Sequence, residues 1–246
     1  ILEDIVFNPT ATIDLTGFLR RTKIKSLTIN NFDTSATVNN GTNYQNYRYF
    51  FEGVEFTTPD INVEFNAIIS DAPMNMEHFA QFILGKPNTL DFSGLTTGPS
   101  GRINVYELSY FLNQLNATTA DESFKFVEGL NKFKAQTGYD FNGTYAFRFA
   151  GNLTFPKTSV TKNFASDFLH SGVISGNLQN FFQLHNTEYL GTTSPNCANW
   201  DTSMITAFNA SFYNIKFDGD FTLNWDMSQC SSFYAMFFLS GCVGTN

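Results

Sequence analysis

The sequence predicts an α/β solenoid, with a parallel β-sheet on one face and short helices on the other. One observation is a repeat: residues 199–203 read Asn-Trp-Asp-Thr-Ser, and residues 224–228, placed 25 positions later, read Asn-Trp-Asp-Met-Ser. A second is the pattern inside each unit, where a short run of alternating apolar residues precedes a polar turn and apolar residues spaced by three or four. Such a unit cannot bury its apolar face alone, so the copies are expected to stack.

An N-terminal unit carries a related pattern. Residues 24–29 alternate like a strand, and residues 31–35 read Asn-Phe-Asp-Thr-Ser. Phe32 therefore stands where Trp200 and Trp225 stand in the later copies. Looser copies start near residues 61, 90 and 153, so we expect degenerate central repeats.

The whole chain, 1–246, is expected to form a single repeat domain. Residues 20–112 hold the N-terminal repeats, and residues 151–246 hold the C-terminal repeats. Between them, residues 113–150 are predicted to be an irregular insertion, because residues 113–138 do not fit the repeat. A helix is expected within this insertion over residues 120–133, where apolar residues recur at helical spacing.

The recurrent aspartates are predicted to cap the helices. Asp33, Asp201 and Asp226 occupy the same repeat phase, and a short side-chain oxygen at a helix start accepts a free backbone N–H. A column of aspartates could instead hold Ca²⁺, and paired carboxylates could hydrolyse a glycosidic bond. Capping explains all three positions, so we assign no metal, no cofactor and no catalytic residue.

The chain has 29 Phe among its 246 residues, and a recurrent subset is predicted to form the core. Rings that share a repeat phase would stack from copy to copy as an aromatic spine, which stabilises the fold beyond simple burial. The alternative is an aromatic groove for a carbohydrate or an apolar partner. The predicted spine residues are Phe50, Phe82, Phe111, Phe168, Phe212 and Phe237.

The insertion around residues 39–47 mixes Asn with Tyr, a composition suited to adaptable polar recognition. Tyr44 and Tyr47 are therefore candidate partner-binding residues. The alternative is an ordinary solvated loop.

Composition and charge exclude several classes of protein. The net charge of −8 argues against nucleic-acid binding, and no run of about 18 apolar residues is present to span a membrane. Asn, Ser, Thr and Gly supply the polarity, since charged residues make up only 15% of the chain. This balance favours an extracellular, cell-surface or virion-surface location. Because the first residue is Ile1, we expect a mature or excised piece of a longer protein.

The cysteines are predicted to be buried thiols, with one disulfide as the alternative. They are Cys197, Cys230 and Cys242.

The phrases quoted above resemble a known repeat. Residues 27–35, the two Asn-Trp-Asp-x-Ser copies, and Phe237, Phe238, Gly241 and Cys242 at the end are similar to the 25-residue repeat of BspA-like bacterial surface proteins. These proteins, common in mycoplasma and lactobacillus, are relatives of the leucine-rich repeats. The resemblance covers residues 20–56 and 195–246 well and residues 57–112 and 139–190 weakly, while residues 113–138 do not fit it. It implies a leucine-rich-repeat-like solenoid and an adhesive or structural surface scaffold with no known catalytic residues.

No enzyme is expected. The sequence has no HExxH, GxSxG, Walker or GxGxxG motif. His78, the histidine inside a repeat segment, has no partner histidine four residues later. A carbohydrate-active enzyme on a parallel solenoid is a distant third hypothesis.

Two hypotheses for function remain. The first is a non-catalytic extracellular surface scaffold that mediates adhesion or receptor binding, with a protein or glycan as partner. The alternative is a structural subunit of a filament, virion or surface layer, assembled by end or side stacking of solenoids. It is suggested by the apolar last repeat at residues 233–239, because solenoids need polar caps to remain soluble.

Overall fold

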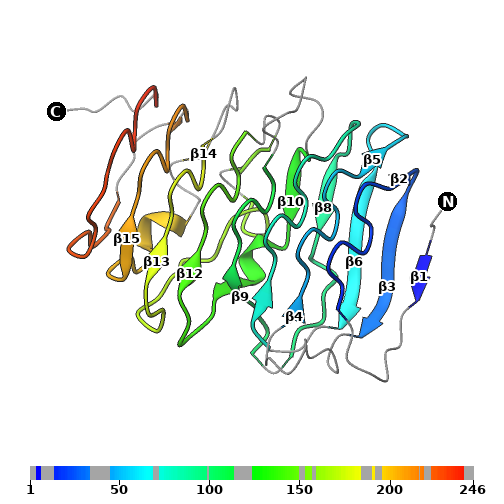
Figure 1. Cartoon of the computed structure of the whole chain (residues 1–246), viewed down its shortest axis with the longest axis horizontal. Helices are drawn as coiled ribbons and strands as arrows, with labels where there is room; N and C mark the ends of the chain where they lie inside the picture. The colour runs from blue at the N-terminus through cyan, green and yellow to red at the C-terminus, as the bar shows by residue number, and fades with distance from the viewer. Residues whose placement is uncertain are drawn as a thin grey trace.

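The structure is a computed structural model of the whole chain. It describes residues 4–6, 14–33, 45–68, 72–98, 100–113, 124–149, 153–156, 159–183, 190–191, 196–215, 217–218 and 223–240. These residues form a parallel β-solenoid whose coils follow one another along the long axis of the molecule (Figure 1).

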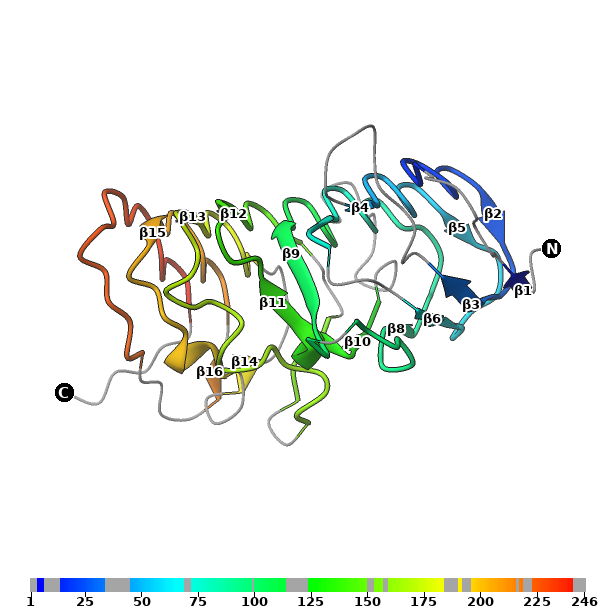
Figure 2. The ribbon, with the colours of Figure 1, turned by 90° about the horizontal axis from the view of Figure 1, so that it is seen from below.

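Two parallel sheets form opposite parts of the coil wall (Figure 2). The first has the order β1-β3-β6-β8-β10, and the second has the order β15-β13-β12-β9-β7-β4 with β11 also paired to β9. The strands of the first sheet are β1 (Asp4–Val6), β3 (Leu27–Asp33), β6 (Asn62–Ile68), β8 (Thr89–Asp91) and β10 (Phe126–Glu128). Those of the second are β4 (Gln45–Asn46), β7 (Met74–Asn75), β9 (Ile103–Glu107), β11 (Phe133–Ala135), β12 (Phe141–Asn142), β13 (Gly176–Asn177) and β15 (Ile205–Ala207).

Two short strand pairs and two single-turn helices complete the described elements. β2 (Lys23–Ile24) pairs with β5 (Glu55–Phe56), and β14 (Leu190–Gly191) pairs with β16 (Phe217–Asp218). The helices are the 3-10 turns η2 (Leu130–Lys132) and η3 (Asn196–Asn199). The parallel solenoid is thus present, but the predicted face of short helices is wrong for the described residues.

Chains of overlapping turns stand where helices were expected. After β4, the N–H groups of Phe50, Glu52 and Val54 each donate to the carbonyl three residues earlier, at 3.1–3.3 Å. The alternate N–H groups donate to the next coil instead: Tyr49 to Glu77, Phe51 to Phe79 and Gly53 to Gln81, at 2.7–3.0 Å. Each of these backbone donors is therefore satisfied without a helix, as burial requires.

Left-handed residues spaced by four explain why the sequence resembled a helix. Tyr49 and Gly53 have φ of 57° and 65°. The same spacing recurs at His78 and Phe82, Tyr145 and Phe149, Ala210 and Asn214, and Ala235 and Leu239. A turn chain that repeats every four residues places apolar side chains inward at nearly the 3.6-residue period of an α-helix, so the two patterns look alike.

A six-residue motif begins each turn segment. Its first residue is Asn in four of the eight described copies. The Asn side-chain oxygen accepts the N–H two residues later, as Asn46 does from Arg48 and Asn75 from Glu77, at 3.2 and 3.0 Å. The described copies start at Asp14, Asn46, Asn75, Glu107, Asn142, Asn177, Ala207 and Ser232. Successive copies are 25 to 35 residues apart, so the 25-residue period holds only for the last step.

A ladder of eight phenylalanine rings runs through the core, one ring per coil. Adjacent ring centroids are 5.4–6.0 Å apart. The rings belong to Phe18, Phe50, Phe79, Phe111, Phe147, Phe182, Phe212 and Phe237. The structure thus places four of the six predicted spine residues in one ladder.

Two predicted spine residues lie elsewhere. Phe82 is a left-handed turn residue and only half-buried, because the ladder ring of its coil is Phe79. Phe168 is buried, but its ring packs on Phe164 and Trp200, at 4.3 and 5.0 Å, away from the ladder. Both assignments were wrong because the coils differ in length.

The predicted insertion, residues 113–150, is part of the solenoid wherever it is described. Residues 124–149 carry β10 and β11, β12 and η2, and these strands pair within the two sheets. The helix predicted over residues 120–133 is not formed by residues 124–133, which make β10, η2 and the start of β11. One hydrophobic cluster, from Leu15 to Met236, runs through all these coils.

Candidate binding groove

The structure separates the predicted site residues into structural roles. Asp201 and Asp226 accept the N–H groups of Ser203 and Ser228, at 3.1 and 2.8 Å, so they cap turns rather than helices. The indoles of Trp200 and Trp225 stack at 6.3 Å with planes 6° apart. For Phe32 and Asp33, at the end of β3, the side chains lie outside the described structure.

Of the two predicted partner-binding tyrosines, the structure describes Tyr47 alone, and it places this side chain inside the molecule. Tyr47 is only 3% exposed, and its ring lies 5.9 Å from Phe50, so it belongs to the core. Tyr44 lies outside the described residues. The composition of the loop suggested exposure, but Tyr47 follows Asn46 in the turn motif, where the second position points inward.

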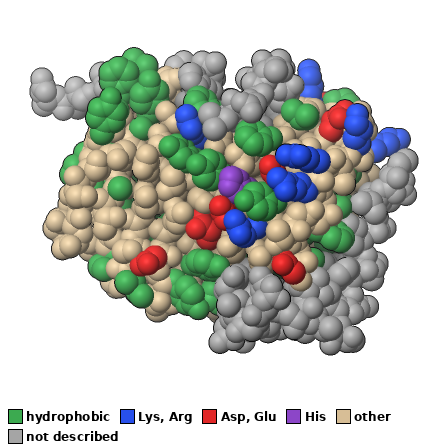
Figure 3. All heavy atoms as spheres, in the orientation of Figure 1, with side chains coloured by type: hydrophobic (Ala, Val, Ile, Leu, Met, Phe, Trp, Pro, Cys, Tyr) green, Lys and Arg blue, Asp and Glu red, His purple; other side chains and the backbone are tan. Residues whose placement is uncertain are grey.

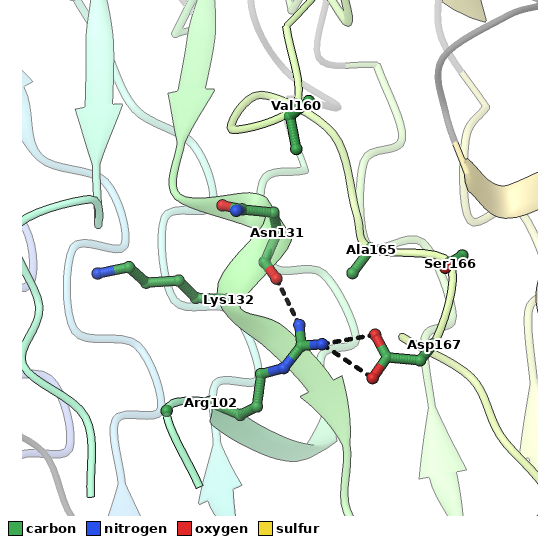
Figure 4. Close-up of a pocket in the computed structure, with 8 residues that line it drawn as sticks. Arg102, Asn131, Lys132, Val160, Ala165, Ser166 and Asp167 are labelled. Carbon is green, nitrogen blue, oxygen red and sulfur yellow. Dashed lines mark hydrogen bonds and ion pairs between the residues drawn. The ribbon is translucent and has the colours of Figure 1, made fainter.

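A polar groove crosses three coils beside β9 and β11. It has two adjoining hollows of about 610 and 460 Å³, and Arg102 and Asp167 line both of them. Figure 4 shows the guanidinium of Arg102 between Asn131 and Asp167, which also line the larger hollow. Its guanidinium donates to both carboxylate oxygens of Asp167, at 2.7 and 2.8 Å, and to the carbonyl of Asn131 at 2.6 Å.

Two lysines add positive charge to the groove. The ammonium of Lys134, on β11, lies 3.3 Å from the Asp167 carboxylate. Lys132, at the end of η2, donates to the backbone carbonyls of Ser93 and Leu95 at 2.7 Å each. Burial lowers the pKa of Lys132, although the carboxylate of Asp91 works against this shift.

The ion cluster keeps Asp167 ionised. Partial burial opposes ionisation, but the charges of Arg102 and Lys134 and their hydrogen bonds outweigh it and hold the pKa of this carboxyl below its usual value. Among the described lining residues, Asp167 is the single carboxylate, and the two cations that contact it are Arg102 and Lys134.

Side chains with an amide or a hydroxyl group make up half of the residues that line the smaller hollow. Its polar lining residues other than the ions are Ser100, Asn104, Gln136 and Thr137. Two residues beyond Asn104 on the same face of β9, the ring of Tyr106 lies 5.5 Å from the ring of Tyr139. The groove therefore combines a cationic centre, hydrogen-bonding groups and a nearby aromatic pair.

A second surface is an aromatic column on the turn segments. Tyr49, His78, Tyr110 and Tyr145 stack in sequence with centroid distances of 4.8, 4.5 and 5.0 Å. Arg20 covers the outer face of the column at Tyr49, and Arg148 covers Tyr145, at 4.9 and 4.7 Å. Basic and acidic side chains likewise crowd around a histidine on the face seen in Figure 3. Because the ring faces are covered, this column stabilises the turns and offers a ligand only ring edges.

Sequence reasoning missed the groove residues. Arg102, Lys134 and Asp167 are separated by 32 and 33 residues, which is one coil in this part of the chain. No local motif links them, and only knowledge of the coil length would have aligned them. Among the described residues, no group of three His, Cys, Asp or Glu side chains is placed to hold a metal ion.

Comparison with protein-family models, with curated proteins and with solved structures finds no match to this chain. Within the described residues, no helix has the length and apolar character needed to cross a membrane.

Proposed function

We propose that this protein is a non-catalytic extracellular surface scaffold that mediates adhesion or receptor binding through its solenoid. The observation that carries the proposal is the polar groove around Arg102, which opens on the wall of a continuously packed rod. A protein or glycan on another surface is the partner that such a groove would receive. The resemblance of the C-terminal repeats to BspA-like surface proteins supports the same function.

The solenoid suits this role because it holds the groove rigidly. Each coil is bonded to the next through backbone hydrogen bonds, and the phenylalanine ladder fills the space between the walls. Side chains on such a frame lose little conformational entropy on binding, which favours affinity. The groove residues come from three consecutive coils, so binding requires only that these coils stay stacked.

Blocking the groove tests the proposal. Ser166 lines the larger hollow and is exposed, so Ser166→Trp would fill the hollow without changing its charge. We expect the fluorescently labelled protein to bind glycan-coated or protein-coated surfaces saturably, and Ser166→Trp to weaken this binding at least tenfold. Ser26→Trp, at an exposed position on another coil, is the matched control and should bind as the wild type does. Equal binding by the two variants would exclude the groove as the binding surface.

A second candidate function is end-to-end assembly, and the last described coil favours it. Tyr234, Phe238 and Leu239 are 81%, 56% and 63% exposed, and Phe18 at the opposite end of the ladder is 41% exposed. Within the stack each coil donates N–H groups to the next, as Ala210 does to Tyr234. The polarity of this bonding directs donors outward at one end and acceptors outward at the other, so a second copy could continue the stack.

Light scattering and electron microscopy of the purified protein test this candidate. If copies stack end to end, the protein should form rods whose length grows with concentration, and Leu239→Ser should shorten them. Ile174→Ser removes a similarly exposed aliphatic side chain from the wall and is the control. Monomers at all concentrations would rule out this assembly.

A further inference from the structure

We infer that the groove around Arg102 binds a carboxylated saccharide, such as a uronic-acid unit of an acidic glycan. This inference rests on the proposed function and names the chemical class of its ligand. Three features of the groove carry it: a local excess of positive charge, a carboxylate already held in the binding geometry, and a lining of amides and hydroxyls.

The groove is a cationic site on an acidic protein. The chain has a net charge of −8, whereas in the groove two cations, Arg102 and Lys134, bind a single carboxylate, Asp167, and leave an excess of one positive charge. Lys132 also lines the larger hollow, but its ammonium is bonded to the carbonyls of Ser93 and Leu95. Local charge of this sign raises the concentration of anionic ligands near the site and repels cationic ones. An anion is therefore favoured here over a neutral or basic partner.

Asp167 shows what the cations are arranged to hold. One arm of the Arg102 guanidinium contacts both Asp167 oxygens, and the ammonium of Lys134 contacts one of them. Hydrogen bonds from a guanidinium to an ionised carboxylate are roughly twice as strong as those between neutral groups, so this arm of Arg102 favours a carboxylate or another oxyanion. Asp167 is 43% exposed on its side chain and lies in a turn segment outside both sheets, so a ligand carboxylate can exchange with it.

The rest of the lining suits a sugar. Hydroxyl groups of a saccharide need donors and acceptors in alternation, which Gln136, Thr137 and Ser100 provide together with backbone groups. Each hollow, of about 610 and 460 Å³, falls within the usual volume range of small-ligand sites, about 300–1,000 Å³. The Tyr106–Tyr139 pair begins two residues beyond Asn104 along β9, so a ligand longer than one sugar could lay the carbon face of a ring on it.

The test compares one oligosaccharide in two charge states. The probes are tetragalacturonate and its fully methyl-esterified form, which has the same sugar skeleton without the negative charges. Binding to the full chain would be measured by calorimetry at two salt concentrations. We expect the acid to bind at least tenfold more tightly than the ester. A higher salt concentration should weaken binding of the acid but not of the ester, because salt screens charge pairs in an open groove.

Two variants with matched controls locate the site. Lys134→Gln should weaken binding of the acid about fivefold, whereas Lys23→Gln, in an exposed ion pair with Glu55 on another coil, should leave it unchanged. Asp167→Asn should strengthen binding several-fold, because the competing internal carboxylate is removed. Glu55→Gln makes the same change in net charge and should have no effect. Melting curves of each variant check that the solenoid remains folded.

The outcomes separate this inference from the proposed function. Equal affinity for acid and ester, or equal effects of Asp167→Asn and Glu55→Gln, would overturn the carboxylate assignment. In that case the protein could still bind neutral glycans or protein-coated surfaces, and Ser166→Trp could still weaken this binding. The proposed scaffold function would then hold without the carboxylate assignment. Tight binding of free sulfate at the same site would show a general oxyanion site rather than a saccharide site. If Lys134→Gln does not fold, the comparison of the acid and the ester with the wild-type protein still tests the carboxylate assignment.

Discussion

The rings of Phe111 and Phe147 lie 5.7 Å apart at 67°, while the other steps of the phenylalanine ladder are tilted by 35° or less. The backbone register does not change here, since the N–H of Leu112 donates to Ala146 at 2.7 Å as in neighbouring coils. Instead, the ring moves from the fifth to the sixth position of the turn motif. The core keeps one large ring per coil, although the residue that supplies it changes.

This arrangement predicts that Phe147 is a central residue of the core. Phe147→Ala should lower the free energy of unfolding by about 3–5 kcal/mol, because the ring is fully buried and contacts rings of both adjoining coils. Phe82→Ala is the matched control. That ring is only half-buried at a turn, and its loss should cost about 1 kcal/mol or less. Urea titrations followed by circular dichroism would measure both values, and equal losses would contradict the ladder.

The same ladder shows how far the sequence could predict the fold. Trp200 and Trp225, and Phe212 and Phe237, stack as their 25-residue separation indicated. The 25-residue period does not hold for the coils before residue 207, which are 29 to 35 residues long. In those coils only the six-residue turn motif recurs at the same place in each coil. Helices were predicted because inward residues such as Phe50, Phe51 and Val54 recur at spacings close to 3.6.

The candidate groove was less predictable than the fold. A parallel solenoid places residues one coil apart beside each other, so Arg102, Lys134 and Asp167 meet only after the coil length is known. The predicted binding residue Tyr47 was placed by composition alone, and composition does not show which side of a turn faces inward. The sequence pattern therefore predicted the solenoid better than it predicted which side chains meet on the surface of the solenoid.

The left-handed turn positions predict an unusual response to glycine. Ala210 has φ of 51°, a conformation that costs an L-residue about 1–2 kcal/mol, so Ala210→Gly should be neutral or stabilising by up to about 1 kcal/mol. Ala146 is fully buried and does not have a positive φ, so Ala146→Gly should destabilise the protein by about 0.5–1 kcal/mol or more. Thermal unfolding of the two variants would measure this contrast. Similar destabilisation by both would show that residue 210 is not strained.

The two described cysteines should differ in reactivity. Cys197 and Cys230 are free, but burial of Cys197 raises the pKa of its thiol to about 12, so almost none of it is thiolate at neutral or mildly alkaline pH. Cys230 is half-buried. We expect a maleimide to label Cys230 in the native protein at least tenfold faster than Cys197, and both at similar rates in denaturant. Mass spectrometry of labelled peptides would read both sites, and fast native labelling of Cys197 would contradict its burial.

Glu107 should make stability depend on pH. It occupies the first position of a turn motif that is Asn in neighbouring coils, where its carboxylate accepts from Ser109 and Asn142, at 2.9 and 3.2 Å. Burial raises the pKa of Glu107 above its ordinary value, and the hydrogen bonds from Ser109 and Asn142 offset this only in part.

The direction of the pH effect follows from this raised pKa. The folded state binds the proton more tightly than the unfolded chain, so this contribution to stability is present at low pH and is lost as the pH rises through the folded-state pKa. Glu107→Gln removes the titration. The melting temperature of Glu107→Gln minus that of the wild type should therefore increase as the pH rises from about 4 to 7. Glu55→Gln, at a partly exposed side chain, is the control for the change in net charge and should show no comparable trend. A difference between Glu107→Gln and wild type that stays constant or shrinks toward neutral pH would contradict the raised pKa.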